Sequence, residues 1–81
     1  MPHYVVTLLT DDRDLSNAIA VSEVWAANVD EAVRTALAQV GMQQPSFVEF
    51  IERAHVVTDD TTSIVRDIPY SQRLLFMPDG A

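Results

Sequence analysis

The sequence predicts an α+β domain: an antiparallel sheet of four or five strands with one helix packed on one face, in the order β-β-α-β-β-β. Two observations carry this prediction. Several short segments are rich in β-branched and aromatic residues and are separated by polar turns, which is typical of strands. One longer segment repeats its apolar residues with the period of an α-helix. Because the chain has 81 residues and shows no linker or repeat, we interpret residues 1–81 as a single domain.

The first two strands are expected at residues 3–10 and 18–26. The first alternates through valine, threonine and leucine, and the second carries isoleucine, valine and tryptophan. The polar residues from Asp11 to Asn17, which lie between them, are typical of a turn. Two strands joined by a short polar loop favour an antiparallel hairpin.

Residues 28–41 are expected to form the helix. Asn28 can cap its first turn, and Glu31 stands three residues later, as in a capping box. Gly41 is predicted to close the last turn in a left-handed conformation. The apolar residues fall on one stripe of this helix. They are Val29, Ala32, Val33, Ala36, Leu37 and Val40.

The segment after the helix is harder to interpret. Residues 42–45 are expected to be a loop, because Pro45 disfavours helix at the residue before it. Residues 47–58 fit two patterns. Their alternation favours a strand, which is the interpretation we adopt, whereas Ser46 followed by Glu49 resembles a helical capping box.

Two further strands are expected near the C-terminus. Residues 59–63 are polar and predict a turn. Residues 64–68 predict a short strand that stops at Pro69, and residues 72–77 predict a last strand at an edge of the sheet. Residues 78–81 are expected to fray.

The charge of the chain is strongly negative. Twelve acidic residues face five arginines, lysine is absent, and the net charge is −7. This charge repels nucleic acids and anionic membranes, so we expect direct binding to neither. No apolar run approaches the ~20 residues of a membrane span, and no signal-peptide pattern stands at the N-terminus, so we expect a cytoplasmic protein. The absence of cysteine excludes disulfides and thiolate metal sites, and we expect no cofactor.

The predicted strands carry apolar residues on both faces. A helix is about 10 Å wide and strands repeat every ~4.8 Å, so one helix covers only two or three strands. The other face of the sheet therefore needs a second cover. A second copy of the chain is the simplest cover, so we expect a homo-oligomer. In the first predicted strand, one face carries Val5 and Leu9 and the other carries Tyr4, Val6 and Leu8. In the second, the two faces carry Ile19, Val21 and Trp25, and Ala18, Ala20 and Val24. In the last, they carry Leu75 and Met77, and Leu74 and Phe76.

The acidic segment after the first strand carries a metal-ligand pattern. Asp12, Asp14, Ser16 and Glu23 occupy positions 1, 3, 5 and 12 of a loop that resembles the calcium-binding loop of EF-hand proteins. In that resemblance, Ala18 would supply a backbone carbonyl. The preceding residues are strand-like rather than helical, so a solvated hairpin turn is the alternative and the interpretation we favour.

The chain shows no pattern typical of an active site. The two histidines, His3 and His55, lie far apart in sequence and lack a matched third ligand. The candidate partner-binding residues are Trp25, Tyr70 and Arg73, because tryptophan, tyrosine and arginine are enriched at the centres of protein interfaces.

We therefore expect a small acidic protein-binding or self-assembling domain without catalytic activity. One alternative is a ligand-binding module, for calcium at the Asp12 loop or for a small molecule between two protomers. Another is an acidic decoy that blocks a nucleic-acid-binding protein, in which case the partner is a basic protein.

Overall fold

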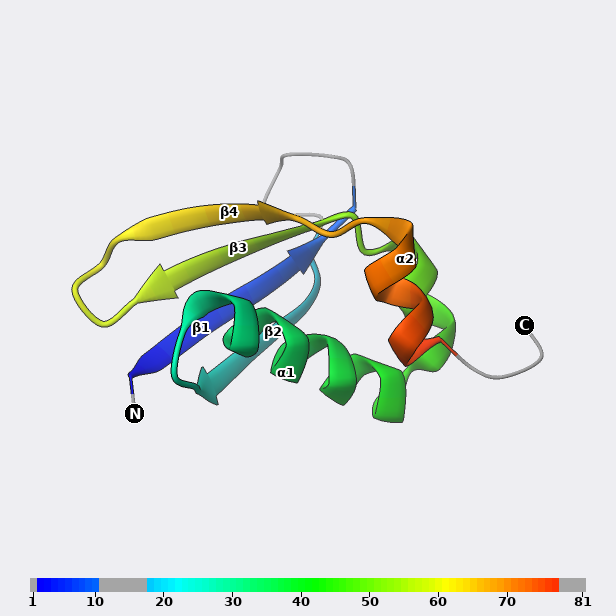
Figure 1. Cartoon of the computed structure of the whole chain (residues 1–81), viewed down its shortest axis with the longest axis horizontal. Helices are drawn as coiled ribbons and strands as arrows, with labels where there is room; N and C mark the ends of the chain where they lie inside the picture. The colour runs from blue at the N-terminus through cyan, green and yellow to red at the C-terminus, as the bar shows by residue number, and fades with distance from the viewer. Residues whose placement is uncertain (1, 11–17, 78–81) are drawn as a thin grey trace.

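The computed structural model of this chain describes residues 2–10 and 18–77. Within these ranges the chain forms a four-stranded antiparallel sheet with a helix packed against one face, which confirms the predicted α+β fold class (Figure 1). The strands lie in the order β2-β1-β3-β4, so β1 and β3 are central and β2 and β4 form the edges. The elements are β1 (His3–Leu9), β2 (Ala18–Trp25), α1 (Val29–Gln43), β3 (Arg53–Thr58) and β4 (Ser63–Asp67).

The core lies between α1 and the face of the sheet that α1 covers. β1 supplies Tyr4, Val6 and Leu8 to this core, and β3 supplies Ala54 and Val56. No buried polar or charged residue occurs in the described ranges, so the packing of apolar side chains is the main source of stability. Five of the six residues of the predicted stripe are buried, namely Ala32, Val33, Ala36, Leu37 and Val40, and the sixth, Val29, is partly buried and packs against the core.

The pairing between β1 and β2 contains one irregularity. Leu8 pairs with Ala20, whereas Leu9 pairs with Ala18, so Ile19 is an extra residue of β2. Simple alternation predicts Ile19 and Ala20 on opposite faces. That prediction is wrong, because both side chains pack against the core.

The start of α1 confirms the predicted cap. The backbone N–H of Glu31 donates to Oδ1 of Asn28 at 2.8 Å. The Glu31 carboxylate in turn accepts the backbone N–H of Ala27 at 3.3 Å, one residue before the cap. Asp30 and Glu31 also place negative charge at the positive end of the helix dipole. No helix in the described part of the chain is long and apolar enough to cross a membrane.

The end of α1 differs from the prediction. Gly41 does not close the helix, which continues through Gln43 into the expected loop and is closed by Gln44, whose N–H donates to the carbonyl of Val40 at 2.7 Å. Gly41 instead permits a close contact: a Cβ atom at this position would lie 2.8 Å from the backbone oxygen of Phe76. The glycine is therefore required for packing rather than for a turn.

Residues 47–58 divide between the two alternatives that the sequence leaves open. Pro45–Phe50 form a 3₁₀ helix (η2), and β3 begins only at Arg53. The prediction of a strand is wrong for the first half of the segment and confirmed for the second. Pro45 explains the first half, because its fixed backbone angle suits the first residue of a helical turn. Val48 and Ile51 follow at helical spacing and are buried.

The prediction of a last strand at residues 72–77 is wrong. Tyr70–Arg73 form a short helix (α2), and Leu74–Phe76 continue as a 3₁₀ helix (η3). Pro69 starts the turn, since its carbonyl accepts two backbone N–H groups from α2. A short apolar run fits strand and helix equally well in sequence. Tertiary packing decides here, because Phe76 packs against the core.

The contact at Gly41 gives a test of how the C-terminal segment is held. Gly41→Ala would raise the helix propensity of α1, and at an open helix position it would stabilise by about 1 kcal/mol. Here the added methyl group meets the backbone of Phe76. We expect a net loss of about 1–3 kcal/mol in the free energy of unfolding, measured by urea denaturation followed by circular dichroism.

Gln39→Ala is the matched control, because Gln39 lies two residues earlier on α1 and is exposed. Its effect on the free energy of unfolding should stay within about 0.5 kcal/mol. A Gly41→Ala protein as stable as the parent would contradict this account of the contact.

Candidate functional site

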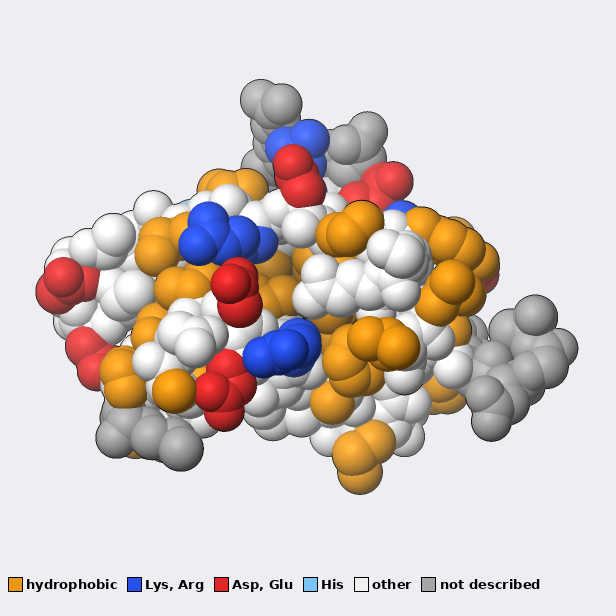
Figure 2. All heavy atoms as spheres, viewed as in Figure 1, with side chains coloured by type: hydrophobic (Ala, Val, Ile, Leu, Met, Phe, Trp, Pro, Cys, Tyr) orange, Lys and Arg blue, Asp and Glu red, His pale blue; other side chains and the backbone are white. Residues whose placement is uncertain are grey.

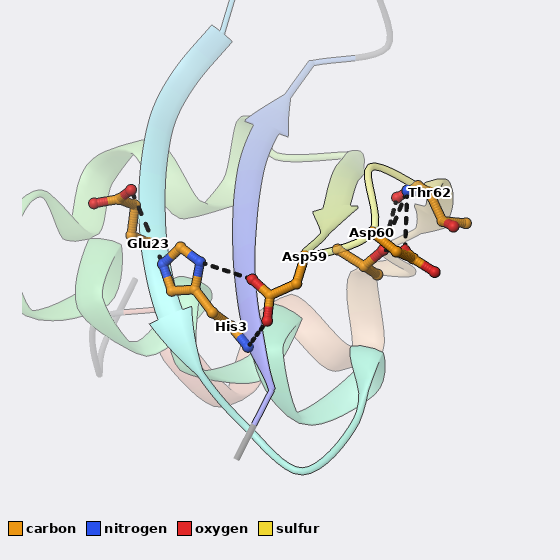
Figure 3. Close-up of polar contacts among 6 residues, drawn as sticks. His3, Glu23, Asp59, Asp60 and Thr62 are labelled. Carbon is orange, nitrogen blue, oxygen red and sulfur yellow. Dashed lines mark hydrogen bonds and ion pairs between the residues drawn. The ribbon is translucent and has the colours of Figure 1, made fainter.

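The face of the sheet that points away from α1 is the candidate site, and we call it the open face. Figure 3 looks onto it, with the helices behind the strands. The described part of the chain leaves its large apolar side chains in solvent: Val21 is 62% exposed, Trp25 is 67% exposed and Val65 is 56% exposed. By strand alternation, its residues are Val21, Glu23 and Trp25 of β2; His3, Val5, Thr7 and Leu9 of β1; Arg53, His55 and Val57 of β3; and Ser63, Val65 and Asp67 of β4. Leu9, which pairs with Arg53, is the buried residue of this set.

The pairing register aligns these residues in rows across the sheet. One row runs Val21, Thr7, His55 and Val65, and the next runs Glu23, Val5, Val57 and Ser63. We call the four valines of these rows, Val5, Val21, Val57 and Val65, the valine rows. Beyond them, Arg53 pairs with Asp67 across β3 and β4, with Nε and Oδ1 3.5 Å apart. Apolar side chains with charged groups around them are the arrangement found in many protein interfaces.

The opposite end of the open face carries an aromatic and acidic group, which we call the Trp25 corner: His3, Glu23, Trp25 and Asp59. Figure 3 shows His3 between Glu23 and Asp59. The rings of His3 and Trp25 lie 4.7 Å apart and are tilted by 53°. Nε2 of His3 is 3.9 Å from a Glu23 carboxylate oxygen, and Nδ1 is 3.5 Å from Oδ1 of Asp59. The backbone N–H of His3 also donates to Oδ2 of Asp59 at 3.2 Å. The imidazole therefore stands between two carboxylates.

The turn next to this corner holds a third carboxylate, that of Asp60, through hydrogen bonds. The hydroxyl of Thr58 donates to Oδ1 of Asp60, and the backbone N–H of Thr62 donates to the same oxygen at 3.2 Å. These hydrogen bonds, that from Thr58 first, lower the pKa of Asp60 below its ordinary value of 3.8. Thr61 takes a positive φ of 66° in this turn. The polar turn predicted at residues 59–63 is confirmed for residues 59–62, because β4 begins at Ser63.

Two hollows indent the described surface. One, of about 350 Å³, lies beside the Asp60 turn and is lined by Pro2, Tyr4, Thr58, Asp59, Asp60 and Thr62. The other, of about 390 Å³, is lined by Thr10, Ala18, Ile19, Phe47 and Phe50. Neither lining contains a histidine, so neither joins a nucleophile to an imidazole base.

The predicted calcium ligands divide between described and undescribed parts of the chain. Asp12, Asp14 and Ser16 lie outside the described residues. Glu23 pairs with Val5 in the middle of β2, with its carboxylate next to His3. Among the described residues, no group of three or more histidine, aspartate or glutamate side chains is placed to hold a metal ion. The calcium loop therefore stays a prediction.

The predicted partner-binding residues lie on two separate surfaces. Trp25 is on the open face, whereas α2 carries Tyr70 and Arg73 at the other end of the molecule (Figure 1). Arg73 stacks over the Tyr70 ring at 5.3 Å and donates from Nη1 to the carbonyl of Glu49, which ties α2 to η2. Apolar side chains gather around this end as well (Figure 2). Those that are exposed are Met42, Phe47, Phe50, Tyr70, Leu74 and Leu75.

Sequence reasoning did not assign His3, Asp59 or Val65 to the site. Asp59 reaches His3 across 56 residues of chain, so no local pattern links them. For Val65 a signal was present, because it alternates with Ile64, whose side chain packs against the core. That alternation would have placed Val65 on the uncovered face.

No match was found among protein-family models, curated proteins or solved structures.

The Asp60 turn gives a pH-dependent test. Because the folded-state pKa of Asp60 is lowered, its carboxylate stabilises the fold above pH 3.8, and this contribution is lost as the pH falls through the lowered value. Asp60→Asn keeps the shape and removes the charge. We expect a lower melting temperature than that of the parent at pH 7, with the difference shrinking below pH 3.8.

Glu49→Gln serves as the control, because Glu49 is exposed on η2, away from this turn. Its effect on melting should be small at both pH values. A difference between Asp60→Asn and the parent that is independent of pH would show that the carboxylate does not act through its charge.

Proposed function

We propose that this chain is a noncatalytic protein-binding domain that assembles with a second copy of itself through the valine rows of the open face. The observation that supports the proposal is the exposure of Val21 and Val65 in one row. Val5 and Val57, which are half-buried, lie in the next row on the two central strands and add apolar surface there. Exposed apolar side chains that lie together on one face mark an interaction surface more often than scattered ones do.

The physical argument concerns coverage. The described helix α1 packs over the core face, so it cannot shelter the valines on the other side of the same sheet. Removing a valine side chain from water is worth about 1.5 kcal/mol or more. In a dimer with two-fold symmetry, both protomers use the same surface, so the same valines would be buried on each protomer.

Charge and composition favour protein over other partners. The net charge of −7 opposes binding to nucleic acid and to anionic lipid. The open face combines apolar, aromatic and charged side chains, which is the composition of protein interfaces. A protein surface is therefore the partner that suits it best.

Size-exclusion chromatography with light scattering tests the proposal. We expect a mass that rises with concentration from 9.0 kDa to twice that value. The double variant Val21→Thr/Val65→Thr keeps the β-branched shape and adds hydroxyl groups. It should weaken self-association at least tenfold, since a loss of about 1.4 kcal/mol corresponds to a factor of ten.

Met42→Thr is the matched control, because Met42 is exposed on α1 and lies off the open face. It should leave the self-association constant unchanged. A chain that stays monomeric at every concentration would overturn the proposal, and so would a double variant that associates as tightly as the parent.

A further inference from the structure

We infer that the Trp25 corner docks a basic protein segment and receives one of its arginine side chains. The proposed binding site lies at one end of the open face, outside the valine rows. It therefore goes beyond self-assembly and stands independently of it. The occupant is identified by charge, by the exposed indole and by the shortage of cations in this chain.

The charge of the open face is unbalanced. Glu23 and Asp59 point into solvent, with side chains 74% and 64% exposed, and both lie against the single imidazole of His3. The arginine on this face, Arg53, is already paired with Asp67. The corner therefore presents two carboxylates and no arginine or lysine of its own, and a cation from outside would complement it.

A second copy of the chain is poorly suited to supply that cation. Lysine is absent, and each copy carries a net charge of −7. Three of the four arginines in the described ranges are already engaged. Arg53 pairs with Asp67, Arg66 pairs with Asp30 at 3.3 Å, and Arg73 donates to the Glu49 carbonyl. A chain of opposite charge fits the corner better than a copy does.

Trp25 makes arginine the preferred cation. Its indole is two-thirds exposed and lies beside the His3 ring. A guanidinium can stack on an indole while its edge donates to a carboxylate, whereas an ammonium is a compact point charge. Glu23 lies two residues from Trp25 on the same strand face, so one arginine can meet both.

Fluorescence titration of Trp25, the only tryptophan in the chain, tests the inference directly. The probe is an extended peptide in which arginine alternates with valine. The comparison peptide has citrulline in place of arginine, which keeps the shape and removes the charge. We expect the arginine peptide to change the Trp25 emission, with binding that weakens as salt is added. The citrulline peptide should bind much more weakly.

Variants locate the contact. Glu23→Gln and Asp59→Asn should each weaken binding about threefold to tenfold, as expected for loss of one partly exposed ion pair. Glu49→Gln removes the same charge from η2, off the open face, and should change binding less than about twofold. Trp25→Leu, followed by calorimetry, should also weaken binding of the arginine peptide.

Several results would overturn the inference. Equal weakening by all three carboxylate variants would mean that only the net charge acts. Equal binding of the citrulline peptide would mean that the corner takes apolar segments. A Trp25 emission that responds to protein concentration and not to the peptide would mean that a second copy occupies the corner.

The titration is done on the full chain at a dilution where light scattering gives the monomer mass. Failure of the peptide to bind then leaves self-assembly through the valine rows untouched. A chain that never self-associates, in turn, leaves this inference standing.

Discussion

The packing of α1 against one face of the sheet is the contact on which the rest of the structure depends. The helix packs its apolar stripe there, and the alternating side chains of the central strands meet it. No polar or charged residue is buried within the described ranges, so the core depends on this one layer of apolar side-chain contacts. The C-terminal segment extends the layer, because Gly41 lets η3 approach α1 closely.

A helix that covers one face leaves the other face of the same sheet without a cover. Strand alternation then forces Val21, Trp25 and Val65 outwards whenever their neighbours point inwards. The acidic composition adds a second constraint, because the chain has too few cations to neutralise its exposed carboxylates. Apolar rows and an acidic, aromatic corner on one surface follow from these two constraints. They carry the proposals of self-association and of binding to a basic segment.

The parts of the fold that local chemistry determines could be predicted from sequence. The cap formed by Asn28 and Glu31 involves neighbours in the chain, and the apolar stripe of α1 follows from helical spacing alone. The predictions are wrong where contacts between residues that are distant in sequence determine the local structure. Gly41 resembles a helix stop until Phe76 packs on it, and residues 72–77 resemble a strand until they dock as helical turns. The site divides similarly: Trp25 could be selected by residue type, whereas Asp59, which contacts His3, comes from a turn that is distant in sequence.

The central claim, that the chain leaves one face of its sheet open for protein contact, is tested most directly by the solvent access of valine methyl groups. Nuclear magnetic resonance with a soluble gadolinium chelate measures this access. In dilute protein the account predicts strong relaxation at Val21 and Val65 and little at Val6 and Val56, which are fully buried. In concentrated protein, Val21 and Val65 should become protected. Equal protection of all four valines in the dilute monomer would contradict the account.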